Sequence, residues 1–406
     1  MGYFISLLLL LGLLPVAVVS AQETPVGAVD SGVYPNLLVE WGVSQDEIDA
    51  RIEAVWQQLF YGDDDTQRVY YPVGDDMAYI IDVANNDIRS EGMSYGMMIA
   101  VQMDKQAEFD RLWKWTKTYL YNADGPYQGY FAWHARTDGS KIDHNPASDG
   151  EIWFVTALFF AAGRWGNGEG IFDYQSEANA ILRTMLHEDA RGTSVTDLFD
   201  AETGLVVFVP MFGRNSSFSD PSYVTPHYYE LWARWAAEDN DSWRRFAAEG
   251  RLFWQRAAHP ETGLMPNYAR FDGSPQPSGD YGEFFYADAW RCAMNVALDY
   301  SWFAADPWQV EQSNRLLAFF QDLGIGRYNS KFEVDGTPAN PQHRAGGLIA
   351  MNAVAALAAT DERRWDFVEE FWEMPTPVGQ YRYYDGLLMM MALLQLSGNF
   401  RAYAPA

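Results

Sequence analysis

The 406-residue chain has only one cysteine, Cys292, and only six histidines. A single cysteine excludes an internal disulfide, and the few histidines show no spacing typical of a metal site. Basic residues are also scarce, with 28 Lys and Arg against 55 Asp and Glu, so the net charge is −27. We therefore expect a solvated acidic surface that binds neither nucleic acid nor an anionic membrane. We also expect no metal or organic cofactor.

After residue 21 the sequence has no apolar run long enough to span a bilayer. The first 21 residues contain such a run followed by Val19-x-Ala21, which resembles a signal-peptidase site and predicts a leader over 1–21. No Lys or Arg stands near the start, so an uncleaved membrane anchor is the alternative. A cleaved leader and folding without disulfides would suit a bacterial periplasmic or secreted protein. We then expect 22–406 to form one monomeric domain without stable membrane association.

The chain is rich in apolar and aromatic side chains, which supply 48% and 16% of its residues. This composition suits a large core and a sugar-stacking cleft equally well. From Ser44 onward the hydrophobic pattern is helical. The pattern predicts helices at 45–61, 91–104, 106–122, 148–163, 173–188, 222–238, 240–258, 286–303, 305–323, 345–359, 361–372 and 384–397. Between them, 189–221 and 259–285 are predicted as extended strands and turns, and such long insertions are often functional.

The predicted helices alternate between two kinds. The first, third and later odd members are amphipathic, as in "TDERRWDFVEEFW" near 361–372, whereas most even members are almost uncharged, as in "AGGLIAMNAVAALAA" at 345–359. A helix that is apolar on all sides is buried, and a helix with one apolar stripe covers a core. The alternation therefore predicts an all-α fold, an (α/α)6 barrel of six helical hairpins with an inner ring inside an outer ring.

The inner helices of such a barrel run in the same direction, so their first residues meet on one face. The residues predicted there are Glu91, Asp149, Tyr223, Asp288, His343 with Arg344, and Tyr383 with Asp385. Each acid taken alone could serve only to stabilise the first turn of its helix, where the helix dipole favours negative charge. Ser148 and Glu151, for example, fit a capping box around Asp149. Three acids on one face of an apolar barrel instead predict an active-site cleft.

Carboxylates between aromatic walls suit glycoside hydrolysis, which needs one protonated acid and one ionised carboxylate. Burial and neighbouring carboxylates raise a carboxyl pKa, whereas the helix dipole and Arg89 would lower that of Glu91. Glu91 can therefore serve as an acid only if burial and its acidic neighbours outweigh those two effects.

Three segments resemble motif regions of glycoside hydrolase family 8: "SEGMSYGMMIAV", "PASDGEIWFVTALFFAAGRWG" and "YADAWRCAMNVALDY". The resemblance covers residues 35–400 and is closest to the reducing-end xylose-releasing exo-oligoxylanases. It implies inverting cleavage of β-1,4-linked xylo-oligosaccharides, with Glu91 as general acid, Asp288 as general base and Asp149 holding the sugar. It also implies that Arg89 and His343 contact the reducing-end sugar and that Tyr223 lies near the attacking water. The further candidates for substrate binding are Trp133, as a stacking platform, Arg344 and Tyr383.

Other functions stay open from the sequence. An open cleft would give an endo-acting xylanase, glucanase or chitosanase, and a protein that only binds oligosaccharides would need the aromatics without the acid pair. A sugar epimerase on a similar barrel would need paired histidines, and only His343 stands at an inner-helix start. Trp133 could also be an ordinary core residue.

Overall fold

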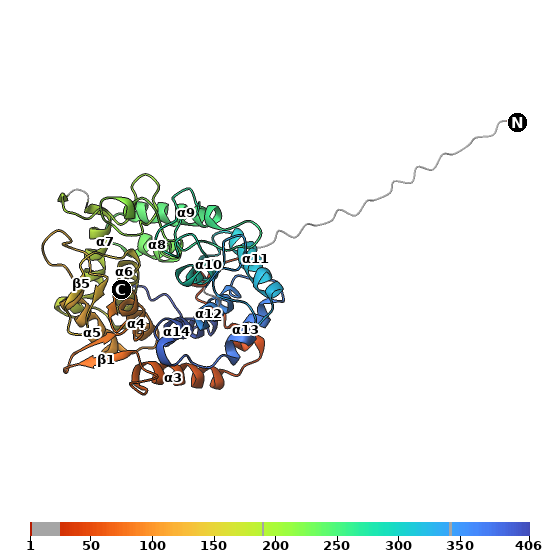
Figure 1. Cartoon of the computed structure of the whole chain (residues 1–406), viewed down its shortest axis with the longest axis horizontal. Helices are drawn as coiled ribbons and strands as arrows, with labels where there is room; N and C mark the ends of the chain where they lie inside the picture. The colour runs from red at the N-terminus through yellow and green to blue at the C-terminus, as the bar shows by residue number, and fades with distance from the viewer. Residues whose placement is uncertain (2–24, 189–190, 341–342) are drawn as a thin grey trace.

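The computed structural model of the chain describes Met1 and residues 25–188, 191–340 and 343–406. The predicted leader over 1–21 lies almost wholly outside the described residues. Within the described part, helices form two concentric rings (Figure 1). The inner helices are α4 (Ser90–Gln102), α6 (Ser148–Trp165), α8 (Pro226–Trp235), α10 (Ala287–Phe303), α12 (Gly346–Ala355) and α14 (Tyr384–Leu396). The outer helices are α3 (Gln45–Tyr61), α5 (Gln106–Trp115), α7 (Tyr174–His187), α9 (Asn240–Ala257), α11 (Trp308–Leu323) and α13 (Arg364–Glu373).

Each inner helix contacts the next one along the chain, and α14 contacts α4, so the inner ring is closed. Each outer helix from α5 to α13 packs on the inner helix that precedes it, while α3 packs on the last inner helix, α14. The predicted (α/α)6 barrel is therefore confirmed. Within the described residues no helix is both long and apolar enough to cross a membrane.

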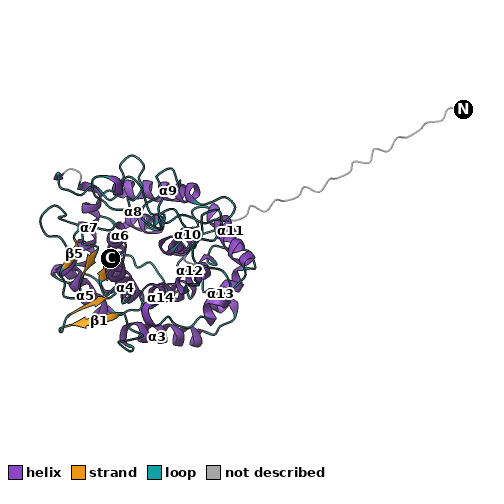
Figure 2. Ribbon diagram, viewed as in Figure 1, coloured by secondary structure: helices purple, strands orange, loops and turns teal. Residues whose placement is uncertain are grey.

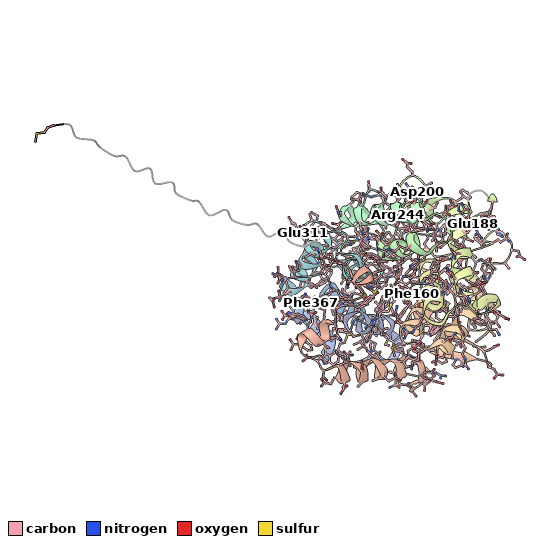
Figure 3. All side chains as sticks on the ribbon, turned by 180° about the vertical axis from the view of Figure 1, so that it is seen from behind. Phe160, Glu188, Asp200, Arg244, Glu311 and Phe367 are labelled. Atoms are coloured by element: carbon pink, nitrogen blue, oxygen red, sulfur yellow. The ribbon has the colours of Figure 1, made fainter. Side chains whose placement is uncertain are left out.

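Burial follows the predicted division between the rings. In α4 every residue except Glu91 is buried, whereas the buried residues of α9 form one stripe at helical spacing, from Trp243 to Ala257. Figure 3 shows the contrast: Phe160 of α6 lies within the body, and Arg244 of α9 lies at the outside. Cys292 is buried in α10, as expected for a small apolar side chain.

Strands are few and lie on one side of the barrel, beside α5 (Figure 2). They are β1 (Tyr70–Val73), β2 (Met77–Ile80), β3 (Ile88–Arg89), β4 (His134–Ala135) and β5 (Lys141–Asp143). All pair antiparallel: β1 pairs with β2 in one sheet, and β4 pairs with both β3 and β5 in another. Of the strands and turns predicted in 189–221 and 259–285, the turns are confirmed, but the described residues there pair only through isolated bridges and form no strand. The remaining short helices are α1 (Ala28–Ser31), α2 (Leu37–Trp41), a π-helix (Thr116–Leu120) and 3₁₀ turns at Gly170–Phe172, Arg214–Ser216 and Gly379–Tyr381.

The C-terminal segment covers the end of the barrel where the inner helices finish. Phe400 is 2% exposed and its ring lies 5.9 Å from that of Trp302, near the end of α10. The backbone of Arg401 exchanges two hydrogen bonds with the side chain of Gln102, the last residue of α4. One end of the barrel is thus sealed, which leaves the end with the helix N-termini for the site.

Candidate active site

Arg291 lies at the centre of the open end of the barrel. Although it belongs to α10 and is only 2% exposed, its guanidinium reaches three carboxylates from three inner helices. Its Nη1 donates to Oε2 of Glu91 at 2.9 Å and lies 3.5 Å from Oδ2 of Asp149. Its Nη2 donates to Oδ1 of Asp288 at 2.9 Å. The predicted convergence of Glu91, Asp149 and Asp288 is therefore confirmed.

The carboxylates are placed by the first turns of their helices. Glu91 is the second residue of α4, Asp149 the second of α6 and Asp288 the second of α10. The helix-start positions favour negative charge, but no side chain caps any of these helices. The predicted capping box at Ser148 and Glu151 is wrong. Both side chains are fully buried and bond to neighbouring loops instead, Ser148 to the carbonyl of Val207 and Glu151 to the N–H of Phe131.

Burial dominates the electrostatics of this cluster. Burial is the largest cause, and with the charges of Asp149 and Asp288 it raises the pKa of Glu91 to about 7 against the opposing charge of Arg291. Burial also raises the pKa of Asp149. One guanidinium cannot neutralise three nearby acids, so holding a proton on one of them relieves the excess negative charge. Burial and acidic neighbours thus outweigh the cations near Glu91, as an acid catalyst requires.

Tyrosines complete the surroundings of Glu91 and Arg291. The hydroxyl of Tyr383 donates to Oε1 of Glu91 at 3.0 Å, so this predicted residue contacts the acid directly. Tyr95, one turn along α4, accepts a hydrogen bond from Nη1 of Arg291. Tyr384 donates to the carbonyl of Ala287 at 3.0 Å and its ring lies beside the guanidinium. The hydroxyls of Tyr383 and Tyr95 thus bond the charged groups without adding charge.

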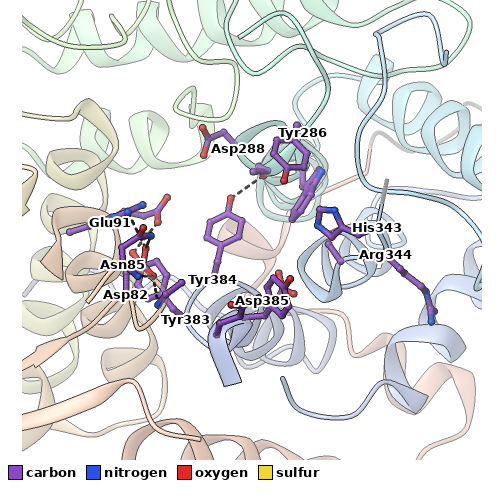
Figure 4. Close-up of a pocket in the computed structure, with 17 residues that line it drawn as sticks. Asp82, Asn85, Glu91, Tyr286, Asp288, His343, Arg344, Tyr383, Tyr384 and Asp385 are labelled. Carbon is purple, nitrogen blue, oxygen red and sulfur yellow. Dashed lines mark hydrogen bonds and ion pairs between the residues drawn. The ribbon is translucent and has the colours of Figure 1, made fainter. Parts of the chain in front are cut away.

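Two pockets, each with a volume of about 390 Å³, meet at the carboxylates. Arg89, Glu91 and Asp288 line both pockets. The first pocket lies between α10, α12 and α14 and is drawn in Figure 4. Its aromatic lining consists of Tyr286, Trp290, Tyr381, Tyr383 and Tyr384. The second pocket is lined by Trp133, Asp149, Phe208, Tyr223 and Tyr268 among others.

The remaining predicted residues divide between the pockets. Trp133 lines the second pocket, is partly exposed, and its indole donates to Oδ2 of Asp143 at 3.1 Å, so it is not a core residue. His343 lines the first pocket, with Nε2 3.5 Å from the hydroxyl of Ser330. Arg344 also borders that pocket, but its guanidinium pairs with Glu370 on α13. Figure 4 shows this side chain directed away from Glu91 and Asp288, so the structure does not bring its charge to the carboxylates.

Tyr223 reaches the site from a different position than predicted. The sequence placed it at the start of an inner helix, but α8 begins only at Pro226. Proline at the first helical position has a suitable φ and needs no N–H, while it disfavours helix in the residue before it. Tyr223 therefore lies in the preceding turn, where its ring is 5.5 Å from the guanidinium of Arg291.

Sequence reasoning missed Arg291, Tyr95 and Asp220. The single positive charge inside the mostly apolar "YADAWRCAMNVALDY", three residues after Asp288, was the available signal for Arg291, because a buried cation needs an acidic partner. Asp220 carries no such signal. It is fully buried, accepts the N–H of Ser222 at 2.7 Å, and has its pKa raised by burial and by Asp288. Among the described residues no group of His, Cys, Asp and Glu is arranged to hold a metal ion.

Comparison with known proteins agrees with this geometry. The sequence model of "Glycosyl hydrolases family 8" matches residues 33–398. The chain belongs to glycoside hydrolase family 8. The family hydrolyses glycosidic bonds with inversion, and the chain is accordingly an inverting glycoside hydrolase.

Two relatives and one solved structure show which members of family 8 the chain resembles in sequence and fold. The reducing-end xylose-releasing exo-oligoxylanase Rex8A of Paenibacillus barcinonensis is 48% identical over 381 residues, covering 93% of this chain and 98% of that protein. The protein of the same activity from Halalkalibacterium halodurans is 42% identical, covering 95% and 98%. A family 8 xylanase from Teredinibacter turnerae, solved as a catalytic mutant with xylohexaose, superposes with a TM-score of 0.90 at 47% identity, covering 93% of this chain and all of that one.

Proposed function

We propose that this family 8 enzyme hydrolyses β-1,4-linked xylo-oligosaccharides and releases xylose from their reducing end. The observation that carries the proposal is the meeting of two aromatic-lined pockets at Glu91 and Asp288. A sugar chain that occupies both pockets has its glycosidic bond between these two carboxylates. The activity of the Paenibacillus and Halalkalibacterium relatives supports xylose as the released sugar.

We assign the chemical roles from the surroundings of each acid. Glu91, with a pKa of about 7, holds a proton in part of the molecules near neutral pH and donates it to the leaving glycosidic oxygen. The side chain of Asp288 is 29% exposed, which lets water reach it, and it activates that water on the opposite face of the sugar. Asp149, almost fully buried between them, holds the sugar at the cleaved bond. Inversion requires the Glu91 and Asp288 carboxyl groups to lie about 6.5–9.5 Å apart, and we expect a separation in that range.

The release of a single sugar requires that the pocket for the leaving side ends after one residue. His343, with the ring of Tyr286 perpendicular to it at 6.2 Å, lines the first pocket and supports this assignment. The imidazole of His343 and the guanidinium of Arg89 would then bond the hydroxyl groups of the reducing-end xylose. A site built to bond a hydroxyl rejects a substrate without it, because its buried polar groups are left unpaired.

An endo-acting xylanase is the second candidate. The Teredinibacter xylanase, solved with xylohexaose, is as similar to this chain as Rex8A and favours a cleft that extends past the first pocket. The alternative of a protein that only binds oligosaccharides does not fit a chain that belongs to a hydrolase family.

Product analysis on xylotriose and on xylotriitol, in which the reducing end is an open alditol, tests the proposal. We expect xylose and xylobiose from xylotriose and no cleavage of xylotriitol. Cleavage of both substrates would establish the endo mode, and cleavage of neither would overturn the assignment to xylan. Proton NMR of the first products should show the α-anomer that inversion of a β-link gives.

We further propose that the enzyme is exported and that residues 1–21 are removed, which places it in the periplasm or outside the cell. The apolar run and the Val19-x-Ala21 pattern support this proposal. N-terminal sequencing of the mature protein from the producing cells tests it, with a start at Gln22 expected and a start at Met1 contradicting it.

A further inference from the structure

Arg89 stands at the junction of the two pockets and is held from behind by two buried acids. Its Nη2 lies 3.1 Å from Oδ2 of Asp82, and its Nε donates to Oδ1 of Asp87 at 3.2 Å. Asp82 is 4% exposed and Asp87 is 6% exposed. The two acids face the same side because they close one turn, in which the N–H of Asp82 donates to the carbonyl of Asp87. Figure 4 shows Asp82 beside Asn85 and Glu91 in this wall of the first pocket.

Asp87 also holds the platform of the second pocket. Its other oxygen, Oδ2, lies 2.8 Å from Nε2 of His134. The His134 ring stacks on the ring of Trp133 with centroids 4.4 Å apart. His134 and Arg89 are directly paired residues of β4 and β3, so the strands fix the spacing between the two side chains that Asp87 joins. One carboxylate thus bonds Arg89, which lines both pockets, through one oxygen and His134, which stacks on Trp133 of the second pocket, through the other.

We propose that Asp87 is a positioning residue that orients Arg89 toward the leaving sugar and, through His134, Trp133 toward the sugar on the other side of the cleaved bond. The inference rests on the proposed function, because that function assigns the two pockets to the two sides of the bond. Arg89 has many rotamers, and a bound sugar must otherwise restrict them at a cost in affinity. This cost is avoided because Arg89 is already held by two carboxylates and Trp133 is already stacked on His134.

The predicted effect is on binding more than on chemistry. Neither Arg89 nor Trp133 moves a proton, so their misplacement weakens the ground state and the transition state alike, which raises KM and leaves kcat nearly unchanged. In Asp87→Asn we expect the KM for xylotriose to rise about tenfold, and the inhibition constant for xylose, which occupies the first pocket alone, to rise severalfold. A merely structural role for Asp87 would lower the thermal midpoint without this pattern.

Asp138→Asn is the matched control. Asp138 lies in the turn between β4 and β5, is exposed, and bonds only within its own turn to Ser140. The same acid-to-amide change there should leave both constants as they are in the parent enzyme. Equal constants in Asp87→Asn and Asp138→Asn would overturn the inference.

A second variant and a measurement on the parent enzyme separate the role of Asp87 from a failure to fold and from a failure of the proposed function. If Asp87→Asn does not fold, His134→Ala removes only the arm to Trp133, and the KM for xylotriose should rise while the inhibition constant for xylose stays unchanged. No rise in KM would overturn the role of that arm. The parent enzyme is measured first on xylotriose and xylotriitol; cleavage of both would refute the exo function, and Asp87 is then judged by the KM of its variant alone.

Discussion

Arg291 gives the site its chemistry because one buried guanidinium serves three carboxylates. Two of its nitrogens are bonded to different acids, and the third acid lies slightly farther away. Breaking a buried charge pair by removing one partner leaves the other uncompensated. Three ionised carboxylates around one guanidinium leave an excess of negative charge, which a proton on one acid reduces, and burial raises the pKa of Glu91 above that of an ordinary carboxyl group.

Replacement of Glu91 by glutamine should reduce kcat by about 10²–10⁴-fold, the usual contribution of a positioned general acid. Glutamine keeps the size, its carbonyl oxygen can still accept a hydrogen bond from Arg291, and its amide NH₂ can donate to the Tyr383 hydroxyl oxygen, so the fold should persist. Turnover of xylotriose and the thermal midpoint are the measurements. Glu53→Gln, on the exposed side of α3, is the control. Unchanged turnover in Glu91→Gln would remove Glu91 from the acid role.

Activity should decline on the alkaline side with an apparent pKa of about 7, because Glu91 must be protonated to act. The profile of kcat/KM against pH reports this ionisation in the free enzyme. Tyr383 donates a hydrogen bond to Glu91 and so favours its ionised form. Tyr383→Phe should therefore move the alkaline limb to higher pH. A shift to lower pH would show that the limb belongs to another group.

The acids of the site could be predicted from sequence because each begins an apolar helix in which charge is rare. The same rule failed for Arg291, which lies one turn inside its helix, where sequence alone gives no indication that it reaches α4 and α6. Asp220 and Asp87 lie in irregular segments, and only the folded chain shows that they adjoin the site. The position of Arg344 was predicted, but not that Glu370 on the neighbouring helix would hold its side chain.

At the scale of the element, α4 is built so closely against its neighbours that its glycines have no room for a side chain. A Cβ on Gly92 would lie 2.5 Å from the Tyr383 ring and 2.7 Å from its hydroxyl oxygen. A Cβ on Gly96, one turn later, would instead lie 2.6 Å from the side chain of Ile80. The first clash would displace Tyr383, which bonds Glu91, whereas the second would displace only a side chain of the core.

Gly92→Ala and Gly96→Ala should therefore differ in activity more than in stability. Overpacking of this kind costs about 1–3 kcal/mol, so both variants should be less stable in urea unfolding. Only Gly92→Ala should also lower kcat/KM on xylotriose, because it displaces Tyr383 from Glu91. Equal loss of activity in both variants, at temperatures where both are folded, would contradict the role of Tyr383.

Helix positions were predictable because the two rings differ in hydrophobic pattern, whereas local hydrogen bonding was not. The sequence of Ser148 and Glu151 fits a capping box, yet each side chain finds a partner in a loop that packs on the helix start. Such loops are distant in sequence, so their contacts override a local signal. Two bridges of the long insertions also have partners distant in sequence, Ser219 with Ala269 and Phe285 with Phe332.

At the scale of the whole molecule, one end of the barrel carries the candidate active site and the other end is closed by packing. The acids, tyrosines and pockets lie at the helix N-termini, and the C-terminal segment seals the opposite end. The net charge of −27 does not oppose the proposed substrate, because a xylo-oligosaccharide is neutral. Stability and catalysis can therefore be changed separately at the two ends.

Phe400→Ala should lower the free energy of unfolding by about 3–5 kcal/mol, the usual cost of deleting a buried aromatic ring. The KM for xylotriose should not change, because Phe400 lies at the sealed end beside Trp302. Urea unfolding and steady-state kinetics measure the two quantities. Phe212→Ala, at a side chain that is 63% exposed, should change neither. A raised KM in folded Phe400→Ala would show that the two ends are coupled.

The packing of α3 on α14 brings the beginning and the end of the double ring together, so that the chain could begin at a different helix. Tyr34 and Ala402 are already in contact, since the N–H of Ala402 donates to the Tyr34 hydroxyl at 3.1 Å. A chain joined between these positions and opened in the turn 236–239, between α8 and α9, would lose α1 and its contact with α10 but keep every contact among the twelve helices of the two rings. The barrel should therefore tolerate circular permutation, which changes the helix at which the chain begins but keeps the order of the helices around the ring.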